Sequence, residues 1–99
     1  MLYAILCEDT PGTLAKRLEN RPAHLERLKA LQAGGRLVLA GPHPAIESPD
    51  PGPAGFTGSL IVAEFASRDA AVAWAAEDPY TAAGVFSRVT VKPFRKVLP

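Results

Sequence analysis

The chain has 99 residues, of which 47% are hydrophobic and 21% charged, and its 11 basic and 10 acidic side chains give a formal net charge of +1. This length and composition predict one small globular domain. The near balance of charge argues against nucleic-acid binding, which needs a clustered basic face. Because no apolar run approaches the roughly 20 residues that span a bilayer, no membrane segment is expected.

Cysteine usage bears on the compartment. Cys7 is the only cysteine, so no disulfide can form within the chain. Its apolar neighbours favour a buried, inert thiol over a reactive one. The first residues also lack the charged region and small-residue cleavage site of a signal peptide. A cytoplasmic protein is therefore expected.

The first part of the chain predicts a strand, a helix and a second strand. The apolar run Leu2–Cys7 has the length of a buried central strand. A turn or two of helix is expected over residues 14–18. The main helix is expected over Pro22–Ala33, because proline fits a first helical turn and Gly34-Gly35 fits a helix end. The second strand is expected over residues 36–41.

The second part begins with a segment rich in proline and glycine. Residues 41–57 hold five of the ten prolines and three of the eight glycines, which predicts a long loop. A third strand is expected over residues 59–65 and a second helix, capped by Ser67, over residues 67–77. A short helical turn over residues 79–83 would then lead into a fourth strand over residues 85–92.

This order, β-α-β-β-α-β, predicts an α+β ferredoxin-like fold, a four-stranded antiparallel sheet with both helices on one face. The other face would be left uncovered. Strict alternation along the fourth strand puts Phe86 on that uncovered face, and Phe94 is expected beside it. Two copies could cover these faces by placing them together, so a homodimer is expected.

His24 is the residue that most needs an explanation. Counting from it, Leu28 lies at i+4 and Leu31 at i+7, so the imidazole falls on the apolar stripe of its helix. The opposite, polar face would carry Arg27 and its charged neighbours. Two interpretations remain open: a structural histidine bonded to a backbone carbonyl, or a working acid/base.

Asp78 is the second candidate, and it also has two interpretations. Before Pro79, an aspartate is a good N-cap for a short helix. Its carboxylate could also accept a hydrogen bond from His24, fixing the ring tautomer. The two roles are compatible, but the sequence does not show whether the side chains touch.

The remaining chemistry-bearing residues form no known signature. His43 is interpreted as a surface histidine in the loop after the second strand. The histidines, Cys7 and Asp78 have no metal-ligand spacing, so no metal is expected. There is no nucleophile elbow around Ser59 and no phosphate-binding loop. No cofactor is expected.

Several short motifs are spread along the chain. They are Arg21-Pro22-Ala23-His24-Leu25, Gly34-Gly35-Arg36-Leu37, Ala40-Gly41-Pro42, Gly55-Phe56-Thr57-Gly58-Ser59, Ala75 to Tyr80 with Asp78-Pro79-Tyr80 at its centre, Ala83-Gly84-Val85 and Val91-Lys92-Pro93-Phe94. Together they resemble the YciI (YCII-related) family, and most closely its short bacterial members. The resemblance covers nearly the full length, so residues 1–99 are expected to form a single YCII-related domain.

The resemblance implies a fold of the dimeric α+β barrel type and a site built around His24 and Asp78. The family is related in fold to small monooxygenases and muconolactone isomerases, and some relatives are linked to dehalogenation of chlorinated aromatics. Most members have no assigned substrate. The resemblance therefore implies a lyase, dehalogenase-like or isomerase-like enzyme that moves a proton on an unknown small molecule.

In this hypothesis Asp78 orients His24, which acts as the general acid/base. Arg21, Ser59 and Tyr80 are candidates for substrate contacts through charge or hydroxyl groups. Arg21 equally fits a solvated surface residue, and Tyr80 equally fits a packing role. The alternative function is a non-catalytic dimeric module that binds a small metabolite or serves as an accessory protein.

Overall fold

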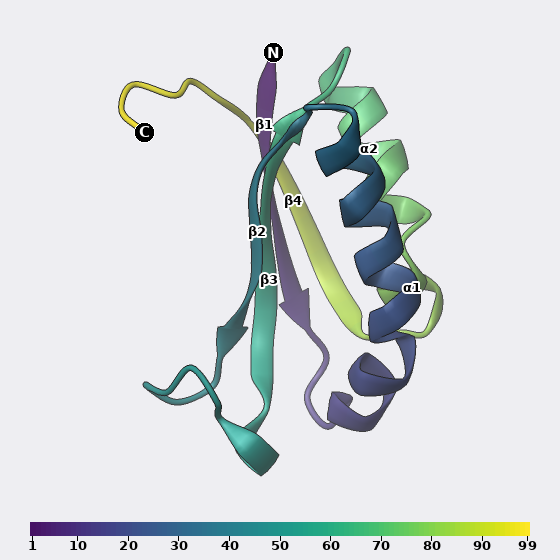
Figure 1. Ribbon diagram of the computed structural model, residues 1–99. Helices are drawn as coiled ribbons and strands as arrows, with labels where there is room; N and C mark the ends of the chain where they lie inside the picture. The colour runs from purple at the N-terminus through teal and green to yellow at the C-terminus, as the bar shows by residue number, and fades with distance from the viewer.

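Four strands form one antiparallel sheet, and the helices cover one face of it (Figure 1). The computed structural model describes residues 1–99. Its elements are β1 (Leu2–Asp9), α1 (Leu14–Ala33), β2 (Leu37–Pro44), the 3₁₀-helix η1 (Gly52–Ala54), β3 (Phe56–Glu64), α2 (Arg68–Ala76), α3 (Pro79–Ala82) and β4 (Phe86–Phe94). The sheet order is β2-β3-β1-β4. This confirms the ferredoxin-like α+β fold and the central position of β1.

Helix α1 begins at Leu14 and passes through Pro22 without ending, so the interpretation of Pro22 as a helix start is wrong. Proline has no backbone N–H, so the carbonyl of Leu18 loses the hydrogen bond that residue 22 would otherwise donate to it. Pro22 and Leu18 both lie on the exposed side of the helix. An interior proline costs a helix about 3 kcal/mol, and burial of a long stripe offsets that cost. The buried residues of the stripe are Arg17, His24, Leu28 and Leu31.

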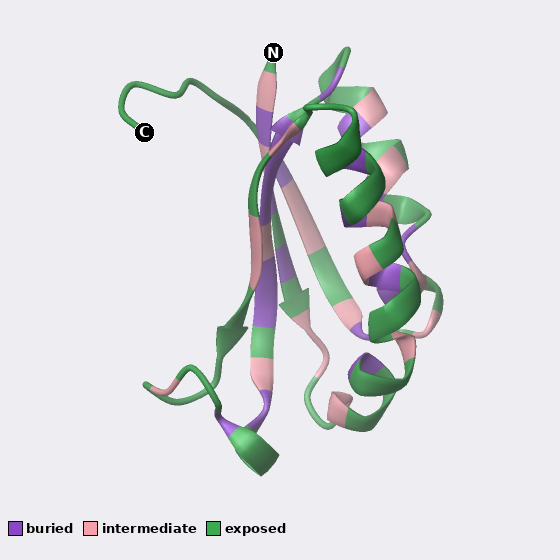
Figure 2. Ribbon diagram, viewed as in Figure 1, coloured by how far each residue is buried: buried purple, intermediate pink, exposed green.

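The core lies between the sheet and the helices. Figure 2 shows the buried residues where the central strands and the helices face each other, and exposed residues on the outer helix surfaces. The core includes Ile5, Leu28, Leu31, Ile61, Ala63, Ala71 and Ala75. Alanines at 71 and 75 bring α2 close to the sheet. None of the helices is both long enough and apolar enough to cross a lipid bilayer.

The proline-rich segment 41–57 contains more regular structure than predicted. β2 continues to Pro44, and η1 and the start of β3 also lie within the segment. The prolines are tolerated because β2 is an edge strand, where a missing N–H need not break the ladder. The expectation that His43 lies in a loop is wrong, since it pairs with Gly58 on β3.

A β-bulge changes which face of β4 carries Phe86. β4 has one extra residue, Ser87, between the pairs that it makes with Glu8 and Asp9. The Ser87 hydroxyl donates to the carbonyl of Glu8 at 3.2 Å. Phe86 consequently turns toward the helices and packs edge-on against Tyr80, with ring centroids 5.4 Å apart. Its predicted place on the uncovered face is wrong, because strict alternation does not anticipate a bulge.

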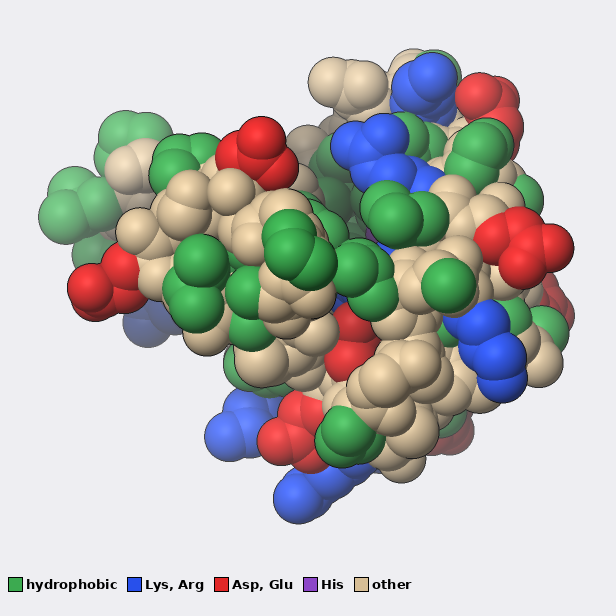
Figure 3. Space-filling view, turned by 90° about the horizontal axis from the view of Figure 1, so that it is seen from below, with side chains coloured by type: hydrophobic (Ala, Val, Ile, Leu, Met, Phe, Trp, Pro, Cys, Tyr) green, Lys and Arg blue, Asp and Glu red, His purple; other side chains and the backbone are tan.

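The sheet face away from the helices is open and partly apolar. By strand alternation it carries Leu6, Leu39 and Phe94, which are 38%, 48% and 40% exposed. The C-terminal tail and the stretch between β2 and η1 project on this side (Figure 1). Viewed from below, acidic and basic side chains are interspersed over the surface (Figure 3). Leu6, Leu39 and Phe94 leave exposed apolar area on the open sheet face.

Candidate active site

His24 and Asp78 are in contact, although 54 positions separate them along the chain. His24 lies in the middle of α1, and Asp78 is the residue before α3. The imidazole Nδ1 lies 2.9 Å from Oδ2 and 3.0 Å from Oδ1 of the carboxylate. Both residues are buried, at 6% and 1% exposure. Because an ionised carboxylate only accepts hydrogen bonds, this arrangement puts the proton of a neutral ring on Nδ1 and leaves Nε2 as an acceptor.

Asp78 is held by two further donors. Its Oδ1 accepts the backbone N–H of Tyr80 at 2.9 Å, so it also caps α3, and its two interpretations hold together. Its Oδ2 accepts Nη1 of Arg27 at 3.2 Å. Arg27 was predicted on the polar face of α1, but its side chain turns inward and is only 21% exposed. A position three residues after His24 is a neighbour on a helix, and that spacing is the signal that could have found it.

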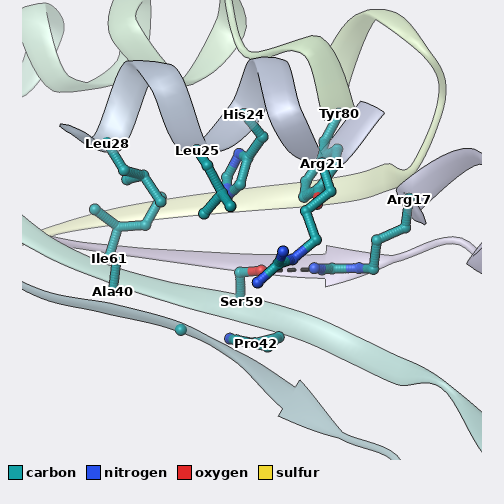
Figure 4. Close-up of a pocket in the computed structure, with 11 residues that line it drawn as sticks. Arg17, Arg21, His24, Leu25, Leu28, Ala40, Pro42, Ser59, Ile61 and Tyr80 are labelled. Atoms are coloured by element: carbon teal, nitrogen blue, oxygen red, sulfur yellow. Dashed lines mark hydrogen bonds between the residues drawn. The ribbon is translucent and has the colours of Figure 1, made fainter. Parts of the chain in front are cut away.

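A cavity of about 150 Å³ opens between α1 and the sheet, and His24 lies in its wall (Figure 4). Its apolar side is formed by Leu25, Leu28 and Ile61. Every fully buried side-chain nitrogen or oxygen of the protein has a hydrogen-bond partner. Nε2 of His24 makes no hydrogen bond, so this atom is not fully buried. Nε2 is therefore reached from the cavity, where a bound molecule could exchange a proton with it.

Arg17 forms the opposite, polar end of the cavity and was not predicted. It is 5% exposed and makes a two-pronged ion pair with Asp9, at 2.7 and 2.9 Å. Its guanidinium lies 4.8 Å from the ring centroid of Tyr80 and 5.4 Å from that of Phe56. Arg17 lies seven residues before His24 on the same stripe, but a helix taken to begin at residue 22 leaves it out.

The three predicted contact residues all line this cavity. Ser59 on β3 is 3% exposed, and its hydroxyl oxygen accepts Nη2 of Arg17 at 2.9 Å, so its own O–H remains to be donated (Figure 4). Arg21 on α1 is exposed and makes no ion pair or side-chain hydrogen bond. Tyr80 is 1% exposed and stacks on His24, with centroids 4.1 Å apart and planes 14° apart. Tyr80 thus supports the imidazole as well as lining the cavity.

The nearby thiol and phenol are held neutral by their surroundings. Burial raises the pKa of Cys7 to about 12, and the negative charges of Asp78 and Asp9 add to this effect. Cys7 is 3% exposed, in keeping with an inert thiol. Burial also raises the pKa of Tyr80, although the charges of Arg17 and Arg21 oppose that shift. Neither group supplies an anion to the cavity near neutral pH.

His43 takes no part in this cavity. It lines a separate hollow on the open face of the sheet, to which Glu8, Arg88 and Lys92 also contribute. No three His, Cys, Asp or Glu side chains come together in a set that could hold a metal ion. The chemistry-bearing groups of the site are thus one imidazole, two carboxylates, three guanidiniums and two hydroxyls, from His24, Asp9, Asp78, Arg17, Arg21, Arg27, Ser59 and Tyr80.

Comparison with known proteins places the chain in a family. The family model described as the YCII-related domain matches residues 1–95. The chain belongs to the YCII-related domain family. It is 60% identical to Protein YciI of Escherichia coli O6:H1 (strain CFT073) over 97 residues, which cover 98% of this chain and 99% of the relative. An uncharacterized protein of Haemophilus influenzae (strain Rd) is 56% identical over the same shares of the two chains.

A solved structure links the YCII-related fold to a named reaction. It is the 5-chloro-2-hydroxyhydroquinone dehydrochlorinase TftG of Burkholderia phenoliruptrix AC1100, in complex with 2,5-dihydroxybenzoquinone. The likeness has a TM-score of 0.83 at 31% identity and covers 96% of this chain and 94% of TftG. The fold is accordingly the ferredoxin-like α+β fold of the dimeric α+β barrel type.

Proposed function

We propose that this YCII-related protein is an acid/base enzyme in which Asp78 orients His24 and Nε2 of His24 moves a proton on a small acidic molecule. One observation supports this proposal most strongly. Nδ1 of His24 lies 2.9 Å from the buried carboxylate of Asp78, while Nε2 of the same ring faces the cavity. A base oriented by a carboxylate is the recurring arrangement of general acid–base catalysis. The reaction class is lyase, dehalogenase-like or isomerase-like.

The cavity supports a substrate of one six-membered ring. An apolar cavity of about 150 Å³ holds one benzene molecule, and the volume here is about the same. The wall formed by Leu25, Leu28 and Ile61 suits a ring face, and Arg21 suits an anionic oxygen at its edge. The complex of TftG with 2,5-dihydroxybenzoquinone supports the same class, because that ring is small, flat and acidic.

The proton step can be written with the groups of the cavity. Nε2 of His24 takes a proton from the bound ring, and the electron pair moves onto a neighbouring oxygen. The free O–H of Ser59 and the guanidinium of Arg21 would stabilise that oxyanion. The imidazolium then returns the proton to a different atom, which is an isomerisation. Alternatively, the electron pair moves back from the oxygen and expels chloride while the imidazolium gives its proton to water, and the net result is an elimination of HCl.

Replacing Arg21 with methionine should weaken binding of 2,5-dihydroxybenzoquinone about tenfold, because a charged hydrogen-bond donor to the anion is lost at an exposed position. The measurement is isothermal titration calorimetry on the wild type and the variant. Lys16→Met is the matched control, since it removes one exposed charge from the same helix outside the cavity. Equal affinity of Arg21→Met and wild type would contradict this role.

Chloride release from 5-chloro-2-hydroxyhydroquinone tests the reaction itself. Binding of the quinone without turnover of this compound or of related ring-sized acids would favour the non-catalytic alternative. No binding in the cavity by any small acidic ring would contradict the proposed function altogether.

We also propose that the protein is a cytoplasmic homodimer. The open sheet face carries Leu6, Leu39 and Phe94, and a second copy of this face would bury them. Light scattering at micromolar concentration should give twice the mass of one chain. A monomeric mass under these conditions would contradict the dimer but leave the cavity of each chain unaffected.

A further inference from the structure

Arg27 reaches the carboxylate of Asp78 from the helix that also carries His24. Its Nη1 donates to Oδ2 of Asp78 at 3.2 Å, and its Nη2 donates to the carbonyl of Trp74 at 2.6 Å. The guanidinium carbon lies 4.3 Å from the Trp74 ring centroid. Arg27 is thus fixed by a carbonyl and a ring face as well as by the carboxylate. Its positive charge is held beside Asp78.

The other charged groups around His24 are paired, neutral or exposed, so Arg27 and Asp78 determine the net charge beside the imidazole. On β1, Asp9 is neutralised by its ion pair with Arg17, and Cys7 keeps its proton because burial raises its pKa. On α3, burial likewise raises the pKa of Tyr80. On α1, Arg21 lies at the exposed end of the cavity, and β3 contributes only the neutral Ser59. The carboxylate of Asp78 is therefore the negative charge that the imidazole meets directly.

We propose that Arg27 is a positioning residue that balances the charge of Asp78, so that His24 can remain neutral with Nε2 free to accept a proton. With Arg27 in place, carboxylate and guanidinium sum to zero. Without it, a carboxylate that is 1% exposed would face only a neutral ring and one backbone N–H. An unpaired buried charge is costly, and a second proton on the imidazole is the nearest remedy.

The geometry of the carboxylate points to the same role. Arg27 holds Oδ2 and the N–H of Tyr80 holds Oδ1, so both oxygens lie within 3.0 Å of Nδ1 of His24. The consequence for catalysis rests on the proposed function, but the charge balance is measured without any substrate. A failure of the proposed charge balance can therefore be distinguished from a failure of the proposed catalytic function.

The test is ¹⁵N NMR of the imidazole of His24 at pH 7 in the wild type, Arg27→Met, Arg27→Gln and Arg27→Lys. Losing one neighbouring positive charge should raise the ratio of imidazolium to neutral ring about tenfold in the Met and Gln variants. Lysine keeps the charge and should leave the ratio close to the wild-type value. Glutamine can still donate a hydrogen bond, so it separates the charge of Arg27 from its hydrogen bonding.

Arg36→Met is the matched control. Arg36 also lies near an aromatic ring, 5.2 Å from the centroid of Phe65, and donates to a carbonyl, that of Glu64, but it contacts no carboxylate. This variant should leave the His24 spectrum unchanged. A wild-type ratio in both Arg27→Met and Arg27→Gln would overturn the proposal, as would an equal change in Arg36→Met. If the Met variant does not fold, the Gln and Lys pair decides.

Discussion

Replacing Asp78 with asparagine should lower turnover by about 10²–10⁴-fold while the fold is kept, because the catalytic proton transfer is lost. Asparagine can still cap α3 with its carbonyl oxygen in the place of Oδ1, while its amide takes the place of Oδ2, and Arg27 keeps its bond to the carbonyl of Trp74. That amide, however, can donate to Nδ1 of His24, which moves the ring proton to Nε2. Nε2 is then no longer a base. Chloride release, or turnover of whichever ring-sized acid proves to be the substrate, is the measurement.

Turnover of the His24→Gln variant should fall by a similar factor, because no side chain then takes the proton. Asp69→Asn is the control for Asp78→Asn, because it makes the same chemical change at an exposed position in the first turn of α2. Turnover within about threefold of the wild type in a folded Asp78→Asn protein would be incompatible with an orienting carboxylate.

Replacing Gly58 with alanine should unfold the protein at a much lower temperature. Gly58 pairs with Glu8 on β1 and with His43 on β2, so it lies inside the sheet. A Cβ at this position would collide with the backbone carbonyl oxygen of Cys7, which has little freedom to move. Overpacking of this kind costs about 3 kcal/mol, equivalent to a fall in Tm of about 15 °C for a domain of this size.

Gly34→Ala is the control for Gly58→Ala. At the end of α1, an added Cβ would meet its nearest atoms at 3.6–3.7 Å, which is ordinary contact, and the backbone is not left-handed. Its Tm should stay within a few degrees of the wild type or rise slightly. Differential scanning calorimetry compares the two variants. A Gly58→Ala Tm close to that of Gly34→Ala would show that the strand relaxes around the extra carbon.

Much of the fold follows from local patterns. The apolar run at the N-terminus, the cap at Ser67 and the break at Asp78-Pro79 each correspond to an element boundary or a central strand. The prediction fails at Pro22 and Phe86, for related reasons. A proline is tolerated in α1 because long-range burial outweighs a local cost, and a bulge at Ser87 depends on how β4 pairs with β1.

The site could be predicted from the sequence less completely than the fold. His24 could be found from its helical spacing, but its contact with Asp78 depends on the packing of α1 against α3. Arg17 was missed because a helix begun at Pro22 excludes it. Arg27 was missed because periodicity gives a residue's position around the helix, whereas a long side chain can bend toward a buried partner.

The most direct test of the account is the tautomer of His24, read from side-chain ¹⁵N shifts in the wild type and in Asp78→Asn. With only two histidines in the chain, His43→Gln assigns the signals. Orientation of His24 by Asp78 predicts that the neutral ring carries its proton on Nδ1 in the wild type and on Nε2 in Asp78→Asn. A proton on Nε2 in the wild type, or the same tautomer in both proteins, would contradict it.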